Sequence, residues 1–161
     1  GRGRASRSLV MVGVKHTLSV AAPIERAFAV FTEGLGRWWP ATHHIGGSDM
    51  VDAVIEPRAG GRWYEKDADG SECEWGYVIA WEPPQRVVLA WQLDADWRYD
   101  PELVTEVEVR FEADGDRTQV TLEHRYLERM GERADEARRA IDSPEGWRGI
   151  LARYAEAAGA R

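Results

Sequence analysis

Disulfide pairs, long apolar runs and an excess of basic residues are all missing from this 161-residue sequence. The single cysteine, Cys73, excludes an internal disulfide, which fits a reducing cytoplasm. No apolar run approaches the roughly 20 residues that a membrane span needs, and no signal peptide is visible, so we expect a cytoplasmic protein without a membrane span. The 28 acidic and 21 basic residues give a net charge of -7, which argues against nucleic acid as a partner.

The length predicts one compact domain. Residues 1–11 carry three arginines and show no hydrophobic period before Met11, a plausible native start. We therefore predict a disordered arm or expression remnant over 1–11 and a single domain over 12–161.

Strands are predicted where apolar and polar residues alternate between turn signals. Such stretches cover 14–20, 50–56, 62–66, 73–81, 87–93, 103–111 and 120–126. In the stretch 103–111 the alternation places Glu106 and Glu108, with Glu112 just beyond, on an exposed face. Gly76 marks a position where a bulge would shift the alternation of its strand.

Helices are predicted on both sides of the run of strands. Pro23 fits a first helical turn, and the apolar spacing that follows ends near Gly34, with a second short helix or turn at 35–39. A helical pattern covers 132–141. Ser143 and Pro144 then form a predicted N-cap and first position of a long terminal helix, whose apolar face contains Trp147, Ile150, Leu151 and Tyr154.

Tryptophan is concentrated between residues 57 and 93, which hold Trp63, Trp75, Trp81 and Trp91. Because tryptophan is large and costly to expose, these side chains either fill a thick core or line a cavity for an apolar molecule. Trp75 and Trp91 are the candidates for a cavity wall, whereas Trp63 and Trp81 fit the packing of strand ends.

The order of elements predicts an α+β domain. A curved antiparallel sheet of about six to seven strands would wrap around a long C-terminal helix, with two short helices after the first strand. The space between such a sheet and its helix is the expected ligand site.

Several short strings in this order resemble the helix-grip superfamily of START and birch-pollen-allergen-like domains (SRPBCC), and within it the heat-shock-protein-90 ATPase activator homologue-like family. The resemblance covers nearly everything from Val14 to Ala158. It is carried by Ala22-Pro23-Ile24-Glu25-Arg26-Ala27-Phe28, Arg37-Trp38-Trp39-Pro40, Pro57-Arg58-Ala59-Gly60-Gly61-Arg62-Trp63, Gly76-Tyr77-Val78, Glu82-Pro83-Pro84-Gln85-Arg86, Val120-Thr121-Leu122-Glu123-His124 and Gly146-Trp147.

This resemblance implies a helix-grip fold and, from most small relatives, the binding of a hydrophobic small molecule, in a bacterial protein. Some superfamily members are aromatases or cyclases, but the family supplies no common catalytic motif. Its name comes from a domain of a larger co-chaperone, and we expect no room here for the additional domain of that protein.

The candidate cavity residues come from inward-facing strand positions, the second short helix and the terminal helix. They are His16, Trp39, Trp75, Tyr77, Trp91, Val107, Val109, Leu122, His124, Trp147, Leu151 and Tyr154. We assign no catalytic residue, no metal ligand and no cofactor.

The histidines leave two interpretations open. His16 and His124 lie on strands that neighbour each other in a helix grip, so they would either serve as cavity acids or bases or be satisfied interior histidines. His43 and His44 fit a cavity rim or a solvated loop better than a zinc site, because no acidic residue or cysteine stands at metal-ligand spacing in that loop.

Three functions remain as hypotheses. The first is binding of a hydrophobic, aromatic or lipid-like small molecule by a monomer or homodimer. The second is an enzyme of the cyclase, dehydratase or hydrolase type that uses a cavity histidine. The third is a chaperone-related protein-interaction module.

Overall fold

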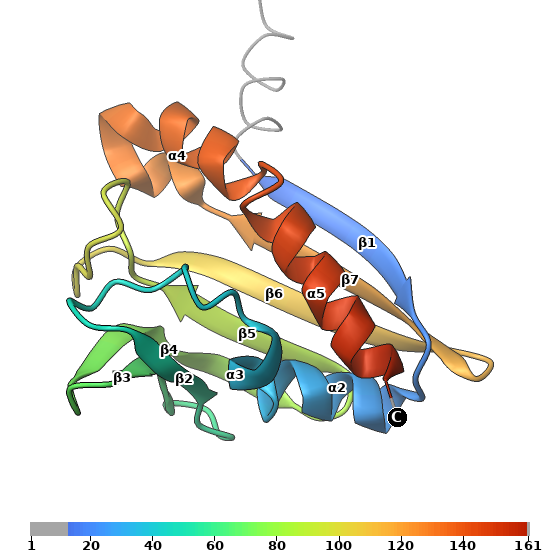
Figure 1. Cartoon of the computed structure of the whole chain (residues 1–161). Coiled ribbons are helices and arrows are strands. Elements are labelled where there is room, and N and C mark those ends of the chain that lie inside the picture. The colour runs from blue at the N-terminus through green and yellow to red at the C-terminus, as the bar shows by residue number, and fades with distance from the viewer. Residues whose placement is uncertain (1–12, 161) are drawn as a thin grey trace, which may run out of the picture.

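A computed structural model describes residues 13–160, so the predicted arm lies outside the described residues. The strands form one antiparallel sheet of seven, in the order β1-β7-β6-β5-β4-β3-β2 (Figure 1). Their bounds are β1 Val14–Val20, β2 Met50–Ile55, β3 Arg62–Asp67, β4 Glu72–Glu82, β5 Arg86–Trp91, β6 Thr105–Asp114 and β7 Arg117–Arg125.

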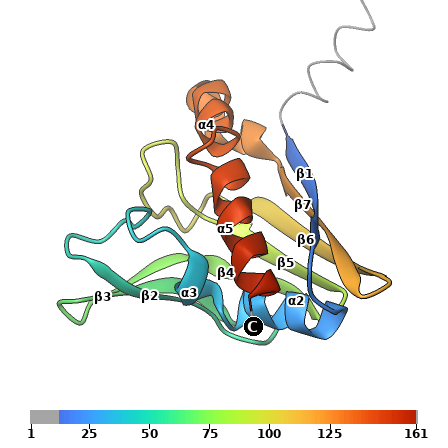
Figure 2. The same cartoon turned by 45° about the vertical axis from the view of Figure 1, so that its right-hand side comes forward.

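Within residues 13–160, five helical segments accompany the sheet. They are α2 Ile24–Thr32, α3 Leu35–Trp38, the 3-10 helix η1 Leu127–Arg133, α4 Ala134–Ile141 and α5 Trp147–Gly159. Helix α5 lies across the concave face of the sheet, with α2 and α3 near its C-terminal end and α4 near its N-terminal end (Figures 1 and 2). The predicted α+β helix-grip fold is therefore confirmed. Among the described residues, no helix is long and apolar enough to cross a membrane.

Strand β4 departs from simple alternation at Trp75 and Gly76. Trp63 on β3 pairs with Gly76, whereas the next residue, Tyr64, pairs with Glu74, so Trp75 is an extra residue in β4. A Cβ at Gly76 would lie 1.7 Å from the Ala90 carbonyl oxygen, so only glycine fits this close approach. The bulge keeps Trp75 inside and turns Tyr77 and Ile79 outward.

The outer face of the sheet carries ion pairs. Glu108 was predicted to be exposed, but its side chain is buried, because Arg86, Arg110 and Arg125 reach over it, with Arg86 Nε 2.5 Å from Glu108 Oε2. Burial by itself raises the pKa of Glu108, but the hydrogen bonds from these guanidinium groups outweigh it and lower the pKa to about 2.

Helix α5 begins later than the sequence predicts. Residues 143–146 form a turn, in which Gly146 N donates to Ser143 O at 2.8 Å, and the helix starts at Trp147. A Cβ at Gly146 would lie 2.1 Å from the Ile141 carbonyl oxygen, so a close approach of backbones replaces the expected Ser-Pro start.

Three side-chain hydrogen bonds connect the C-terminal half of α5 to α2 and α3. Tyr154 Oη donates to Ala27 O at 2.7 Å, Arg153 Nε to Trp38 O at 2.8 Å, and Arg26 Nε to the α5 carbonyl of Ala158 at 3.0 Å. The first residue of the helix, by contrast, contacts the sheet through a bond from Trp147 Nε1 to His124 Nδ1 at 3.1 Å.

Candidate functional site

A cavity of about 370 Å³ opens between the start of α5, strands β4 and β5, and the loop that follows α3. Its volume falls within the roughly 300–1,000 Å³ range of small-molecule sites. Its lining is Trp39, Thr42, His43, His44, Ile45, Trp75, Trp91, Leu93, Trp97, Ala140, Ile141, Ser143, Glu145, Gly146, Trp147 and Ile150.

Four buried tryptophans form the wall. The ring centroid of Trp39 lies 5.1 Å from that of Trp75 and 5.9 Å from that of Trp147, and Trp91 lies 5.9 Å from Trp147. These separations and the tilted or edge-on ring planes fit favourable aromatic contacts. Trp63 supports the wall from behind, 5.7 Å from both Trp75 and Trp91.

The rim combines one exposed aromatic side chain with polar groups. Trp97 is 45% exposed and contacts Trp91 at 6.3 Å between centroids. His43 joins the two sides of the rim, since its Nε2 donates to Glu145 O at 2.6 Å while Trp39 Nε1 donates to His43 O at 3.0 Å. The cavity therefore has an aromatic interior and a polar entrance.

His124 lies behind the tryptophan wall rather than in it. Its side chain is fully buried, 4.9 Å from the Trp91 ring between centroids. Trp147 Nε1 donates to Nδ1, so the neutral ring carries its proton on Nε2, which faces Thr105 Oγ1 at 2.9 Å. Burial lowers the pKa of His124 to about 3, so the ring is neutral near pH 7 and both its nitrogens are engaged.

The structure brings four of the twelve sequence-predicted residues together in the lining: Trp39, Trp75, Trp91 and Trp147. Their binding of a ligand remains a prediction. Five others pack in the hydrophobic core instead: Val107, Val109, Leu122, Leu151 and Tyr154. Strand and helix periodicity identifies the inward face of an element, but it does not show which part of that face other side chains cover.

Two further residues that were predicted to line the cavity lie elsewhere in the structure. Tyr77 is 38% exposed on the outer face, because the bulge at Trp75 reverses the alternation after it. His16 points inward on β1 but lies beyond the cavity, where its Nε2 is 2.8 Å from Asp142 Oδ1. His124, as described above, supports Trp147 without lining the cavity.

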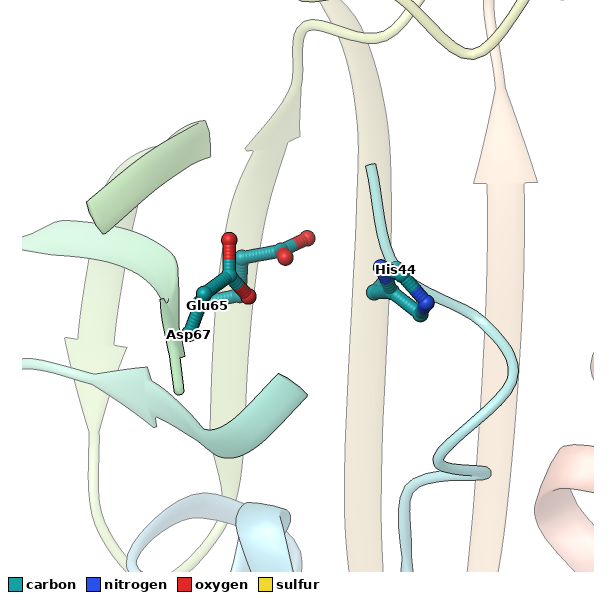
Figure 3. A group of neighbouring side chains, drawn as sticks. All are labelled: His44, Glu65 and Asp67. Atoms are coloured by element: carbon teal, nitrogen blue, oxygen red, sulfur yellow. The ribbon is translucent and has the colours of Figure 1, made fainter. Parts of the chain in front are cut away.

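A buried acidic pair stands next to the cavity. Glu65 and Asp67 are both inward on β3, and His44 from the loop lies opposite them (Figure 3). Potential ligand atoms of the three side chains lie within 4.8 Å of one another. The sequence prediction placed no acidic residue near His44, because this grouping joins residues about twenty positions apart.

The two carboxyl groups have pKa values shifted in opposite directions. Burial, and then the neighbouring Glu65, raise the pKa of Asp67. Burial alone would also raise the pKa of Glu65, but hydrogen bonds from Asp67, from the Ile45 amide and from Trp75 Nε1 lower it overall. Glu65 is therefore the group of the pair that holds a negative charge.

Part of the lining was missed by the sequence predictions. Ile45, Leu93, Ile141 and Ile150 complete the apolar surface, and Ser143, Glu145 and Gly146 belong to the turn that was expected to be helical. The signal that could have found the turn is the glycine immediately before Trp147, since a glycine before the first apolar residue also fits a helix start.

Comparisons with known proteins agree with this architecture. A family model described as Activator of Hsp90 ATPase homolog 1-like protein matches residues 21–159. No curated protein matches the chain.

Two of the solved structures that match this chain are more than 30% identical to it in sequence. An anthrahydroquino-gamma-pyrone synthase, Txn09, is 37% identical, with a TM-score of 0.64 over 90% of this chain and 96% of its own. The self-sacrificing resistance protein CalC from Micromonospora echinospora is 33% identical, with a TM-score of 0.69 over 91% of this chain and 93% of its own. The Aha1 dimer from Colwellia psychrerythraea, at 17% identity and a TM-score of 0.61 over 92% of this chain and 97% of its own, shares the fold.

Proposed function

The chain belongs to the Activator of Hsp90 ATPase homolog 1-like family, and on that premise we propose that its cavity binds a planar aromatic small molecule. The observation that carries the proposal is the wall of four tryptophans around an open volume of about 370 Å³. Aromatic rings favour edge-to-face and offset contacts with other rings, so this wall selects flat ring systems over flexible chains.

The indole N–H of Trp91 favours a ligand that also carries a hydrogen-bond acceptor. Trp91 Nε1 is buried and has no hydrogen-bond partner among residues 13–160. Since a buried donor without a partner costs about 1–3 kcal/mol, a carbonyl or hydroxyl oxygen of a ligand would satisfy it. Thr42, His43 and Glu145 at the rim offer polar contacts for substituents that reach the entrance.

One of the two relatives described above supports the same class of ligand. One is named as a synthase of an anthrahydroquino-gamma-pyrone, a name that describes fused rings with oxygen substituents. The other is named as a self-sacrificing resistance protein, a name that gives no class of ligand.

A fluorescence titration tests the proposal. A hydroxyanthraquinone is expected to quench the tryptophan emission saturably, whereas a saturated fatty acid is not. Replacing Trp97 with Ala should weaken binding by about 2- to 10-fold, the equivalent of one aromatic contact. Tyr99→Ala is the matched control, because Tyr99 is a 40% exposed aromatic residue two positions away that does not line the cavity. Absence of saturable quenching, or equal weakening by both variants, would refute the proposal.

A second candidate function is catalysis of ring closure. It rests on His44, which is one of the residues that line the cavity, and on the 37% identical synthase. In the neutral ring, Nδ1 donates to Gly46 O at 3.1 Å and leaves the lone pair of Nε2 for proton abstraction. Mass spectrometry of an uncyclised aromatic polyketide incubated with the protein tests this candidate: turnover that persists in His44→Ala would remove it. The protein-interaction hypothesis stays a prediction.

A further inference from the structure

The acidic pair on β3 lacks a basic partner. Glu65 is 0% exposed and Asp67 is 3% exposed, and among residues 13–160 no lysine or arginine forms an ion pair with either. Burying a carboxylate without a compensating charge is costly. Glu108, the other buried glutamate, is covered by three arginines. The contrast shows that Glu65 and Asp67 are compensated in a different way.

Glu65 is held by well-formed hydrogen bonds, whereas Asp67 is not. The Glu65 carboxylate accepts from Ile45 N at 2.7 Å, Gly46 N at 3.2 Å and Trp75 Nε1 at 2.9 Å. Among residues 13–160, Asp67 Oδ1 is buried without a hydrogen-bond partner. Asp67 Oδ2 lies 3.5 Å from both the Ser71 hydroxyl and the Cys73 thiol, and the carboxyl group also contacts that of Glu65. A buried, unpartnered carboxylate oxygen calls for a ligand, a proton or a water molecule.

His44 completes the group with the orientation that metal-binding histidines adopt. Its Nδ1 donates to the Gly46 carbonyl oxygen at 3.1 Å, and a backbone carbonyl is a usual partner for the nitrogen of a ligating histidine that does not bind the metal. In the neutral ring this bond leaves a lone pair on Nε2. Gly46 is packed so closely against the pair that a Cβ there would lie 1.8 Å from Asp67 Oδ2. The loop therefore holds the imidazole close to the carboxylates.

We propose that His44, Glu65 and Asp67 bind a divalent transition-metal ion of the zinc type. The chemistry is that of one imidazole nitrogen and two carboxylates, a set that suits Zn²⁺ better than Mg²⁺ or Ca²⁺, which prefer oxygen ligands alone. The ion would neutralise both buried carboxylates and give Asp67 Oδ1 a partner.

The geometry requires a small movement. Two ligands on a tetrahedral zinc ion stand roughly 3.3 Å apart, given metal–ligand bonds of about 2.0 Å. The three side chains offer atoms within 4.8 Å of one another, so His44, which is on a loop, moves toward β3 on binding. Trp75, whose indole donates to Glu65, links the site to the cavity wall.

Calorimetric titration of the metal-free 161-residue chain with ZnCl₂ tests the site, with MgCl₂ and CaCl₂ for comparison. One Zn²⁺ per chain is expected, with little heat from the other two ions. His44→Ala and Asp67→Asn should each weaken Zn²⁺ binding by about tenfold or more. His43→Ala is the matched control, since it removes the adjacent imidazole, which is bonded to Thr42 and Glu145 instead, and should bind Zn²⁺ as the wild type does.

Two results would overturn the inference. If the wild type binds no Zn²⁺ and Asp67→Asn raises its melting temperature, the pair is compensated by a shared proton. If His44→Ala and Asp67→Asn bind Zn²⁺ as tightly as the wild type does, the ion lies elsewhere. Circular dichroism establishes that each variant folds, and His44→Ala, a loop substitution, covers the case in which Asp67→Asn does not. Because no aromatic ligand is used, this outcome is independent of the proposed aromatic binding. A zinc ion on His44 Nε2 would occupy the lone pair that the ring-closure candidate needs, so the two roles of His44 exclude each other.

Discussion

Mild acid is expected to destabilise this protein through His124. The imidazole is fully buried, its Nδ1 accepts from Trp147 Nε1, and no acidic group forms an ion pair with it among the described residues. Burial lowers its pKa from the ordinary value of 6.5 to about 3. Between these two values the unfolded chain binds a proton that the folded protein does not.

The sign and size of the effect follow from this difference. Above pH 6.5 the contribution of His124 is complete, and stability falls as the pH is lowered toward 3. The slope approaches about 1.4 kcal/mol per pH unit below 6.5, and integration from about pH 7 to about pH 5 gives a loss of about 2 kcal/mol. That loss is a large fraction of the roughly 5–15 kcal/mol by which domains are stable.

Urea unfolding at several pH values in this interval measures the effect. The wild type should lose about 2 kcal/mol more than His124→Gln does, although the variant starts from a lower stability because it alters a buried bond. His43→Gln removes an imidazole from the cavity rim and should follow the wild type. If His124→Gln shows the same dependence on pH as the wild type, His124 is already protonated in the folded protein and the reasoning fails.

Three further predictions concern packing and charge. Gly76→Ala should cost about 3 kcal/mol or more in unfolding free energy, because its Cβ would meet the neighbouring backbone at 1.7 Å, while Gly47→Ala, with nothing within 4 Å, should change little. Glu108→Gln should cost about 1–3 kcal/mol at neutral pH in urea unfolding, a difference that shrinks as the pH falls from 4.5 toward 2, where the wild-type carboxylate itself is protonated. Tyr154→Phe should cost about 1 kcal/mol by thermal unfolding, since it removes a buried 2.7 Å hydrogen bond; an unchanged midpoint would show that water replaces it.

Most of the fold could be predicted because alternation and helical spacing are local properties. All seven strands lie close to where the polar–apolar alternation placed them, and the Trp147 helix covers the sheet as expected. The exceptions arise where backbone contacts override the local pattern. The bulge at Trp75 turns Tyr77 outward, and the close approach of Gly146 to Ile141 delays the start of α5.

The candidate site was less predictable, because a cavity is a property of several elements at once. The concentration of tryptophan drew attention to Trp75 and Trp91, which line the cavity, but periodicity could not separate wall residues from core residues such as Leu122. Glu65 looked like one polar residue in a short strand. Only the folded chain shows it beside Asp67 and opposite His44.

The two ends of α5 differ in the number of side-chain hydrogen bonds that hold them to the rest of the protein. Bonds from Tyr154, Arg153 and Arg26 hold the far half against α2 and α3, whereas among the described residues the first turn has one side-chain hydrogen bond to the sheet, from Trp147 to His124. The end of the helix with fewer bonds to its neighbours is expected to move more than the end with more bonds. Loss of the Trp147 bond is therefore expected to loosen the cavity end of α5 first, while the bonds from Tyr154, Arg153 and Arg26 keep its other end in place.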